Sequence, residues 1–213
     1  MNANKLSPFP RPVKRKKAIG VRRDRAGNGG GHQEWQGLPK FLVDSAALRH
    51  DTTEVGELAY LSLGSNLGDR EANLREALAQ LKEGGTLRKL SGSYETQPVD
   101  LPDQPWFLNC VAAFETGKTP RELLKFVLAI EAVMGRLRLR EKGPRKIDID
   151  LLLFGDRVVD EPDLKIPHPA MHQRRFVLEP LAEIAPAARH PVLNKTAAEL
   201  LSALVESQIV RRV

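Results

Sequence analysis

Cysteine, long apolar runs and aromatic residues are all scarce in this 213-residue chain. The single cysteine, Cys110, excludes an intrachain disulfide and a zinc site built from several thiolates. No stretch reaches the roughly 18 consecutive apolar residues that a spanning helix needs, and the N-terminus is charged where a signal peptide would be apolar. We therefore expect a cytoplasmic chain without membrane contact, with one globular domain and an appendage.

The excess of positive charge is confined to the N-terminus. Residues 1–25 hold nine Lys or Arg against one acidic residue, a net +8, so the rest of a chain of net charge +6 carries −2. A basic face for nucleic acid is therefore not expected in the body of the protein. Residues 1–56 also contain several prolines, a run of three glycines and no sustained apolar period, which predicts a disordered leader before one domain at 57–213. A tethering arm for RNA or acidic surfaces is the alternative for this leader.

From residue 57 onward, short apolar segments alternate with turn residues. Apolar runs and alternations predict strands at 58–63, 87–96, 106–115 and 146–154. Helical spacing and capping boxes predict helices after 69, after Thr119, over 176–184 and after Thr196. The leading order, β-α-β-β-α-β, predicts an α+β fold: a ferredoxin-like antiparallel sheet with helices packed on one face and the other face free for ligands.

Two aspartates, Asp148 and Asp150, are the strongest chemical feature. At positions i and i+2 of a predicted strand they point to the same side, close enough to share a hard cation such as Mg²⁺. The polar face of an amphipathic strand would give the same pattern, but a cluster of basic residues lies just upstream: Arg136, Arg138, Arg140, Lys142, Arg145 and Lys146. Carboxylates that hold metal beside guanidinium groups suit polyphosphate transfer, because both neutralise charge on phosphate oxygens. A two-metal nuclease or phosphatase would need further Asp, Glu or His ligands nearby.

Aromatic side chains predict a second contact surface. Phe107 and Asn109 share one face of their predicted strand, so a ring lies beside an amide, an arrangement that suits a flat heterocycle. Because an aromatic residue on a strand more often belongs to the core, this pair alone does not define a site. His168 lies between two prolines, and Arg174 and Phe176 follow shortly after it, so this segment could add a second cationic cluster and a second ring.

Taken together, motifs spread over residues 58–190 resemble the 6-hydroxymethyl-7,8-dihydropterin pyrophosphokinase family of folate biosynthesis. In chain order, the motifs are 60–69 (YLSLGSNLGD), 94–96 (YET), 107–109 (FLN), Glu131 with 135–138 (GRLR), 143–150 (GPRKIDID), 167–169 (PHP) and 174–181 (RRFVLEPL). The block GPRxxDxD is the most specific of them.

The resemblance implies transfer of a pyrophosphoryl group from ATP to the pterin hydroxymethyl oxygen, with release of AMP. It implies two Mg²⁺ ions bound by Asp148 and Asp150, with catalytic arginines Arg136 and Arg145. The residues implied for ATP are Glu131, Arg138, His168 and Arg174. The pterin would be sandwiched by two rings and read at its edge by an amide and by backbone groups, the residues being Phe107, Phe176, Asn109, Thr96, Gln97 and Val99. The implied partners are small molecules, and we expect a monomer.

The chain departs from the family pattern in two places. Many members carry an aromatic residue just before the GPR motif, where a flexible loop closes over the site, whereas this chain has Lys142, so we expect closure to be weaker or to rest on charge. The leader lies outside the pattern, and the length leaves no room for the aldolase or synthase that some relatives carry. The alternative function, a nucleic-acid-binding module on the same sheet, is disfavoured by only seven Phe and no RNP-like aromatic run. The stretch 64–68 (GSNLG) lacks P-loop chemistry and predicts a turn.

Overall fold

The computed structural model of the chain describes residues 56–98, 104–135, 143–205 and 208–213. All of them belong to the unit formed by His50–Val213. The predictions on the leader before residue 56 and on five further residues lie outside the described residues: Val99, Arg136, Arg138, Arg140 and Lys142. Within the described ranges, no helix combines the length and apolar character needed to cross a membrane.

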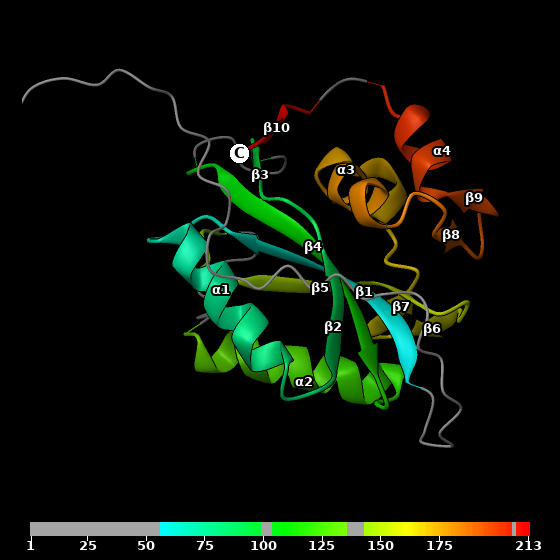
Figure 1. Cartoon of the computed structure of the whole chain (residues 1–213), viewed down its shortest axis with the longest axis horizontal. Helices are drawn as coiled ribbons and strands as arrows, with labels where there is room; N and C mark the ends of the chain where they lie inside the picture. Colours follow the sequence, from blue (N-terminus) through cyan, green and yellow to red (C-terminus); the bar gives the residue numbers. More distant parts are fainter. Residues whose placement is uncertain (1–55, 99–103, 136–142, 206–207) are drawn as a thin grey trace, which may run out of the picture. The chain divides into compact units, whose positions relative to one another are not determined.

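A six-stranded antiparallel sheet forms the centre of this unit (Figure 1). Its strands, in spatial order, are β10 (Val210–Arg212), β3 (Tyr94–Thr96), β4 (Phe107–Thr116), β1 (Glu57–Ser65) and β5 (Asp148–Phe154), and β2 (Thr86–Leu90) also pairs with β4. The connection from β1 through two helices to β5 is the predicted ferredoxin-like order, so the fold class is confirmed.

The single strand predicted at 87–96 is wrong, because the chain forms two strands there, β2 and β3. Ser91 interrupts the ladder: its hydroxyl accepts a hydrogen bond from the Val111 backbone N–H at 2.9 Å. The Ser91 backbone N–H in turn donates to the Val111 carbonyl at 2.9 Å. A side chain that takes over a backbone partner ends one strand and lets the next begin at a new register.

Helices α1 (Arg70–Leu81) and α2 (Pro120–Val133) pack on the first face of the sheet. Asp69 caps α1 by accepting from the Ala72 N–H, and the predicted capping box of Thr119 and Glu122 opens α2. Their apolar stripes meet alternate residues of β4 in the main core, as the spacing predicted: Leu74, Ala77, Leu78, Leu81, Leu123, Val127, Ile130, Leu108, Cys110, Ala112 and Phe114.

The second face is only partly open, which corrects the expectation that it would be free for ligands. Helix α3 (Arg175–Ile184) covers it over β4, and α4 (Ala197–Ser202) packs against α3. Their apolar residues pack with Val111, Ala113 and Leu153 in a second core. The part of this face where β4 and β5 begin carries polar side chains instead, and it is there that the predicted site residues lie.

Two small hairpins complete the unit. β6 (Val159–Glu161) pairs with β7 (Leu164–Ile166), and β8 (Arg189–His190) pairs with β9 (Lys195–Thr196). Gly155 turns the chain from β5 toward β6 at a positive φ of 49°, as the predicted turn requires.

Candidate active site

The register of three strands brings the two predicted halves of the site together. Gly64 on β1 lies opposite Asn109 of β4 on one side and opposite Asp148 of β5 on the other. Ser62, two residues earlier on β1, lies opposite Asp150. Directly opposed residues share a face, so both aspartates lie on the second face, one strand away from the amide.

Gly64 leaves space where a side chain would collide with the amide of Asn109. A Cβ at this position would come within 2.5 Å of Asn109 Oδ1 and 3.7 Å of the Phe107 ring. Asn109 is buried, and its Nδ2 donates to the Thr96 hydroxyl at 2.7 Å. This bond fixes the orientation of the amide, so Oδ1 faces the space above Gly64 as an acceptor.

Each aspartate has an arginine beside it. Arg145 Nη1 is 2.8 Å from Asp148 Oδ2, and Arg174 Nη1 is 3.8 Å from Asp150 Oδ2. Both carboxylates are partly exposed, at 20% for Asp148 and 35% for Asp150. The guanidinium groups therefore lie next to the predicted metal ligands, where they could bind the oxygens of a metal-bound phosphate.

The same two arginines lie over the two rings predicted to hold a heterocycle. The Arg145 guanidinium lies 5.4 Å from the centre of the Phe107 ring, and that of Arg174 lies 5.6 Å from the Phe176 ring. Both rings are half-buried, and Phe176 also packs against the second core. Flat cationic groups stack on the aromatic faces that would also accept a flat heterocycle.

Glu131 stands behind β5. It is 2% exposed, and its Oε1 accepts a hydrogen bond from the Ile149 backbone N–H at 2.7 Å. Ile149 lies between Asp148 and Asp150, on the last strand at that side of the described sheet. Glu131 thus fixes the backbone that carries both aspartates, while its predicted contact with nucleotide stays a prediction.

His168 is neutral in this structure. Burial, reinforced by the nearby Arg174 charge, lowers the pKa of His168 to about 4, although Asp148 and a backbone hydrogen bond act in the opposite direction. Its Nδ1 accepts from the Ala170 N–H at 3.2 Å, which leaves the ring proton on Nε2. At neutral pH His168 can therefore offer an anion a hydrogen-bond donor, without adding positive charge.

Asn66 is a residue that sequence reasoning treated only as part of a turn. The turn is present, but Asn66 is 1% exposed and its backbone N–H donates to the Arg145 carbonyl at 3.1 Å. Its Oδ1 accepts from the Arg145 N–H at 2.8 Å, and its Nδ2 donates to Gln104 and to the Pro105 carbonyl. Asn66 therefore anchors the segment that bears Arg145. The signal that could have revealed it is an amide at a strand end between two glycines.

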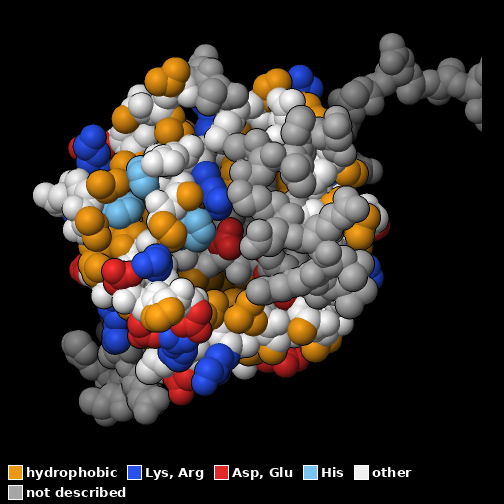
Figure 2. All heavy atoms as spheres, turned by 180° about the vertical axis from the view of Figure 1, so that it is seen from behind, with side chains coloured by type: hydrophobic (Ala, Val, Ile, Leu, Met, Phe, Trp, Pro, Cys, Tyr) orange, Lys and Arg blue, Asp and Glu red, His pale blue; other side chains and the backbone are white. Residues whose placement is uncertain are grey.

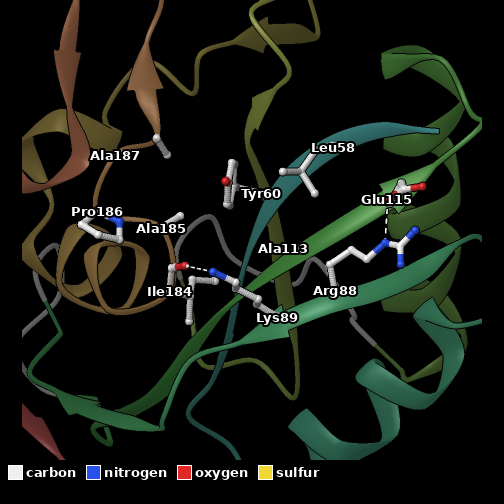
Figure 3. A pocket seen from close by; sticks show the side chains of 11 residues that line it. Leu58, Tyr60, Arg88, Lys89, Ala113, Glu115, Ile184, Ala185, Pro186 and Ala187 are labelled. Carbon is white, nitrogen blue, oxygen red and sulfur yellow. Dashed lines mark hydrogen bonds and ion pairs between the residues drawn. The ribbon is translucent and has the colours of Figure 1, made fainter. Parts of the chain in front are cut away.

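The surface over these residues differs from a second groove on the same face of the sheet. In Figure 2, histidine, acidic and basic side chains gather around a hollow beside the grey atoms. Figure 3 shows a separate groove of about 570 Å³ lined by Leu58, Tyr60, Arg88, Lys89, Ala113, Glu115 and residues 184–188. Its charged rim is already paired: Arg88 bonds Glu115 at 2.6 Å, and Lys89 bonds the Ile184 carbonyl at 3.0 Å. None of the predicted site residues lines this groove.

The carboxylate pair suits a hard cation that takes its remaining ligands from phosphate. Among the described residues, no group of three or more His, Cys, Asp or Glu could hold a metal ion by itself. Two partly exposed carboxylates on one strand face would thus supply some of the oxygen ligands of Mg²⁺, and phosphate oxygens and water would supply the others. An α+β sheet that presents such a pair together with arginines, a ring and an oriented amide suits a transferase of phosphate-containing groups.

Comparison with known proteins gives the family. A family model described as 7,8-dihydro-6-hydroxymethylpterin-pyrophosphokinase (HPPK) matches residues 60–186. The 2-amino-4-hydroxy-6-hydroxymethyldihydropteridine pyrophosphokinase of Methylorubrum extorquens is 44% identical over 155 residues, 72% of this chain and 97% of that protein. The enzyme of the same name from Bacillus subtilis is 46% identical over 132 residues, 61% of this chain and 79% of that protein. The chain belongs to the HPPK family.

Other relatives are much longer than this chain. The Dictyostelium discoideum folic acid synthesis protein FOL1 is 36% identical over 75% of this chain, which spans only 24% of that protein. The crystal structure of wild-type Plasmodium falciparum HPPK-DHPS matches with a TM-score of 0.55 at 20% identity, over 68% of this chain and 43% of that one. At this identity the likeness supports the fold.

Proposed function

We propose that this protein transfers a pyrophosphoryl group from ATP to the hydroxymethyl oxygen of 6-hydroxymethyl-7,8-dihydropterin, giving AMP and the pterin diphosphate, and that it acts as a cytoplasmic monomer. One observation carries the proposal: Asp148, Gly64 and Asn109 lie in one row across three strands. The carboxylate suits metal-bound phosphate, the amide suits the edge of a pterin, and the glycine leaves room between them. The names of the family and of its relatives supply the reaction.

The pterin side of the site follows from the ring and the amide. We propose that the pterin stacks between Phe107 and Phe176, which requires the guanidinium groups now over those rings to move aside. Asn109 Oδ1 would accept from pterin N–H groups, and the backbone of Thr96 and Gln97 would contact the remaining edge. Val99 was predicted to contribute there and lies outside the described residues.

On the ATP side, two Mg²⁺ ions held by Asp148 and Asp150 would neutralise charge on the transferred group. Arg145 and Arg174 are already beside these carboxylates. When ATP binds, the two arginines would turn from the carboxylates to the triphosphate. His168 would donate from Nε2 to a phosphate oxygen. In the reaction, the pterin hydroxymethyl oxygen attacks the β-phosphorus, and the bond from that phosphorus to the oxygen of the departing AMP breaks.

The product of ATP turnover tests the reaction. The full chain is incubated with ATP, Mg²⁺ and the hydroxymethyl dihydropterin, and the nucleotides are separated by chromatography. We expect AMP to form in equal amount to pterin diphosphate, because attack falls on the β-phosphorus. Pterin-dependent ADP or inorganic phosphate would contradict the proposal and would favour a kinase or a phosphatase.

The role of the carboxylates is tested with Asp148→Asn and Asp150→Asn. Each change preserves the size of the side chain and removes one negative charge, so we expect folding to be retained and turnover to fall by about 100-fold or more. Asp156→Asn, in the exposed turn after β5, is the matched control and should keep full turnover. Normal turnover of both site variants at saturating Mg²⁺ would disprove the metal assignment.

A further inference from the structure

The last six residues of the chain, 208–213, lie beside the proposed pterin site. We call them the C-terminal segment. They fall outside the 60–186 range that the family model matches. Their strand, β10, forms one edge of the sheet, whereas β5 with its two aspartates forms the other edge. The segment therefore contacts the pterin half of the site and lies across the sheet from the metal half.

The first contact is with β3. Val210, Arg211 and Arg212 pair with Thr96, Glu95 and Tyr94, and two further bonds extend the pairing: Gln97 N–H to the Ile209 carbonyl at 3.3 Å and Val213 N–H to the Ser93 carbonyl at 3.0 Å. β3 has only three residues and pairs with β4 along its other edge. Such a short strand needs partners on both sides to hold its register. Thr96, the hydrogen-bond partner of Asn109, is thereby held from both sides.

The second contact is with the start of α3. Arg174 is the N-cap residue of α3 and makes no side-chain capping bond. Gln208 supplies the missing acceptor, because its Oε1 accepts from the Arg175 N–H at 2.9 Å. The residue after Arg175 is Phe176, the second proposed pterin ring. The C-terminal segment thus fixes the turn of helix from which that ring projects.

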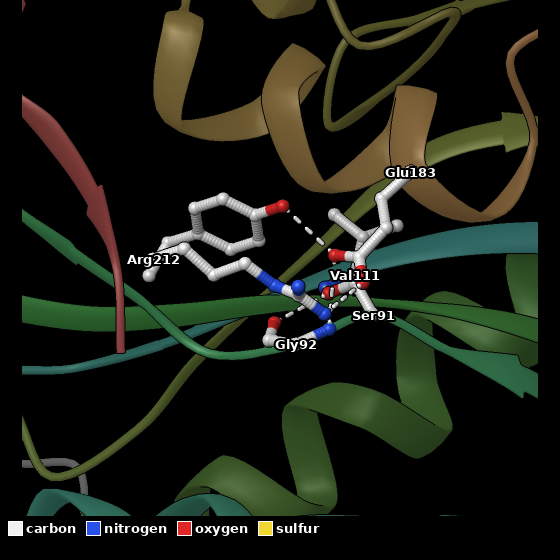
Figure 4. A network of polar contacts seen from close by, with 6 residues as sticks. Ser91, Gly92, Val111, Glu183 and Arg212 are labelled. Carbon is white, nitrogen blue, oxygen red and sulfur yellow. Dashed lines mark hydrogen bonds and ion pairs between the residues drawn. The ribbon is translucent and has the colours of Figure 1, made fainter. Parts of the chain in front are cut away.

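A third set of contacts joins the segment to neighbouring elements. The Arg211 guanidinium lies 5.4 Å from the ring centre of Trp106, the residue before Phe107. Arg212 bonds Glu183 of α3 at 2.7 Å. Glu183 Oε2 also accepts from the Gly92 N–H, just before β3 (Figure 4), and from the hydroxyl of Tyr94 in β3. Glu183 thus ties α3 to β3 directly, and Arg212 adds the C-terminal segment to the same carboxylate.

We infer that the C-terminal segment is a positioning element for pterin recognition, which sets the amide of Asn109 and the ring of Phe176 in their relative places. This inference rests on the proposed function. Removing the segment should weaken pterin binding far more than ATP binding, because β10 and β5, which carries both aspartates, form opposite edges of the sheet. Arg174 also lies at the start of α3. Its long, flexible side chain can still reach phosphate after a small shift of the helix, whereas the same shift would misalign the Phe176 ring with a stacked pterin.

The test compares the full chain with a chain that ends at residue 207. Pterin binding is measured by fluorescence titration with Mg²⁺ and a non-hydrolysable ATP analogue present, and binding of the analogue is measured separately. We expect the truncation to weaken pterin binding by about 10-fold or more while analogue binding changes by less than about 2-fold. Amide hydrogen exchange at 93–97 should also speed up in the truncated chain.

Point variants keep the inference testable if the truncated chain fails to fold. Gln208→Ala removes the acceptor for the Arg175 N–H and should weaken pterin binding by about 3-fold or more. Gln208→Glu keeps an acceptor oxygen at that position, favourable beside a helix N-terminus, and should restore binding. Gln80→Ala, on α1 and so on the other face of the sheet, is the matched control and should bind pterin normally.

The outcomes separate the inference from the proposed function. A full chain that binds no pterin contradicts the proposed function, and the inference fails with it. A full chain that binds pterin, with unchanged affinity in the truncated chain and in Gln208→Ala, overturns the inference alone. Equal weakening of pterin and analogue binding would also overturn it, because it would show general loss of structure.

Discussion

Gly64 lies between two side chains that the proposed site needs, Asn109 on one neighbouring strand and Asp148 on the other. A glycine in the middle of a sheet normally weakens it, because it packs no side chain and costs more backbone entropy on folding. Here it allows Asn109 Oδ1 to occupy the space that a Cβ would take. At the scale of the residue, one missing methyl group leaves room for the polar group that would read a ligand.

We therefore expect Gly64→Ala to disturb substrate recognition. The added Cβ would approach Asn109 Oδ1 to 2.5 Å, so the amide must turn or shift, at a stability cost of about 1–3 kcal/mol. The KM for pterin should rise by about 10-fold or more, with the KM for ATP nearly unchanged, in steady-state kinetics. Gly84→Ala is the matched control, because its Cβ would come within 2.3 Å of the Phe126 ring, at a position outside the site. If both variants show the same pterin KM as the unchanged chain, the role of Gly64 is disproved.

The lowered pKa of His168 predicts that the stability of the protein depends on pH. Its pKa of about 4 in the folded protein lies below the ordinary value of 6.5, so the unfolded chain binds more protons between these two pH values. The stabilisation is complete above pH 6.5 and is lost as the pH falls toward 4. Denaturant unfolding at pH 7 and pH 4.5 should show His168→Gln losing less stability than the unchanged chain, by on the order of 1–2 kcal/mol. Equal losses in the two proteins would show that His168 titrates normally.

At the scale of the element, α2 and β5 form one functional piece. The capping box fixes where α2 begins, and in the last turn of this helix Glu131 bonds to the backbone of β5 between the two aspartates. A buried carboxylate that accepts a backbone N–H at a sheet edge satisfies a donor that would otherwise be costly to bury. The aspartates are therefore positioned from the first face of the sheet, although their side chains lie on the second.

Substitution of Glu131 separates positioning from charge. Glu131→Ala leaves the Ile149 N–H without this acceptor, so we expect a loss of about 1–3 kcal/mol in stability and a fall in kcat of about 10-fold or more. Glu131→Gln retains Oε1 as acceptor and should recover most of both, as measured by denaturant unfolding and steady-state kinetics. If Glu131→Gln were as impaired as Glu131→Ala, the negative charge would be the essential property, as direct participation in the nucleotide site requires.

At the scale of the whole molecule, the second face of the sheet is divided into two regions. Helix α3 and its neighbours bury the apolar part, which contains Val111 and Ala113. The remaining part carries the carboxylates, the amide and the rings at the end of the sheet where β1 finishes. Helix α3, which covers the face, supplies Phe176 at its border, and Arg174 is the N-cap residue of the same helix.

The leader should be dispensable for catalysis. It carries the basic excess of the chain without a sustained apolar period, and both edges of β1 are already paired, with β4 and β5. Deletion of residues 1–55 should leave the thermal midpoint and both KM values within experimental error, as measured by calorimetry and steady-state kinetics. A large loss of activity or solubility would show that the leader contacts the domain and would favour the tethering arm.

The sequence by itself determined the local structure and the chemistry of single segments. The capping box at Thr119, the helical stripe of α1 and the shared face of Asp148 and Asp150 each follow from spacing along a few residues. The alternation of β4 likewise separated Phe107 and Asn109 from the core residues. These features were predictable because backbone geometry alone fixes which neighbours in sequence share a face. The family motifs added the reaction.

Only the tertiary structure decided how these segments meet. The row of Asn109, Gly64 and Asp148 depends on the registers of β1 with β4 and of β1 with β5, which join residues 45 and 84 positions apart. The burial of Glu131 behind β5, the covering of the second face by α3 and the pairing of β10 with β3 arise in the same way. Such pairings are selected by the packing of the whole core, and no pattern within one segment encodes them.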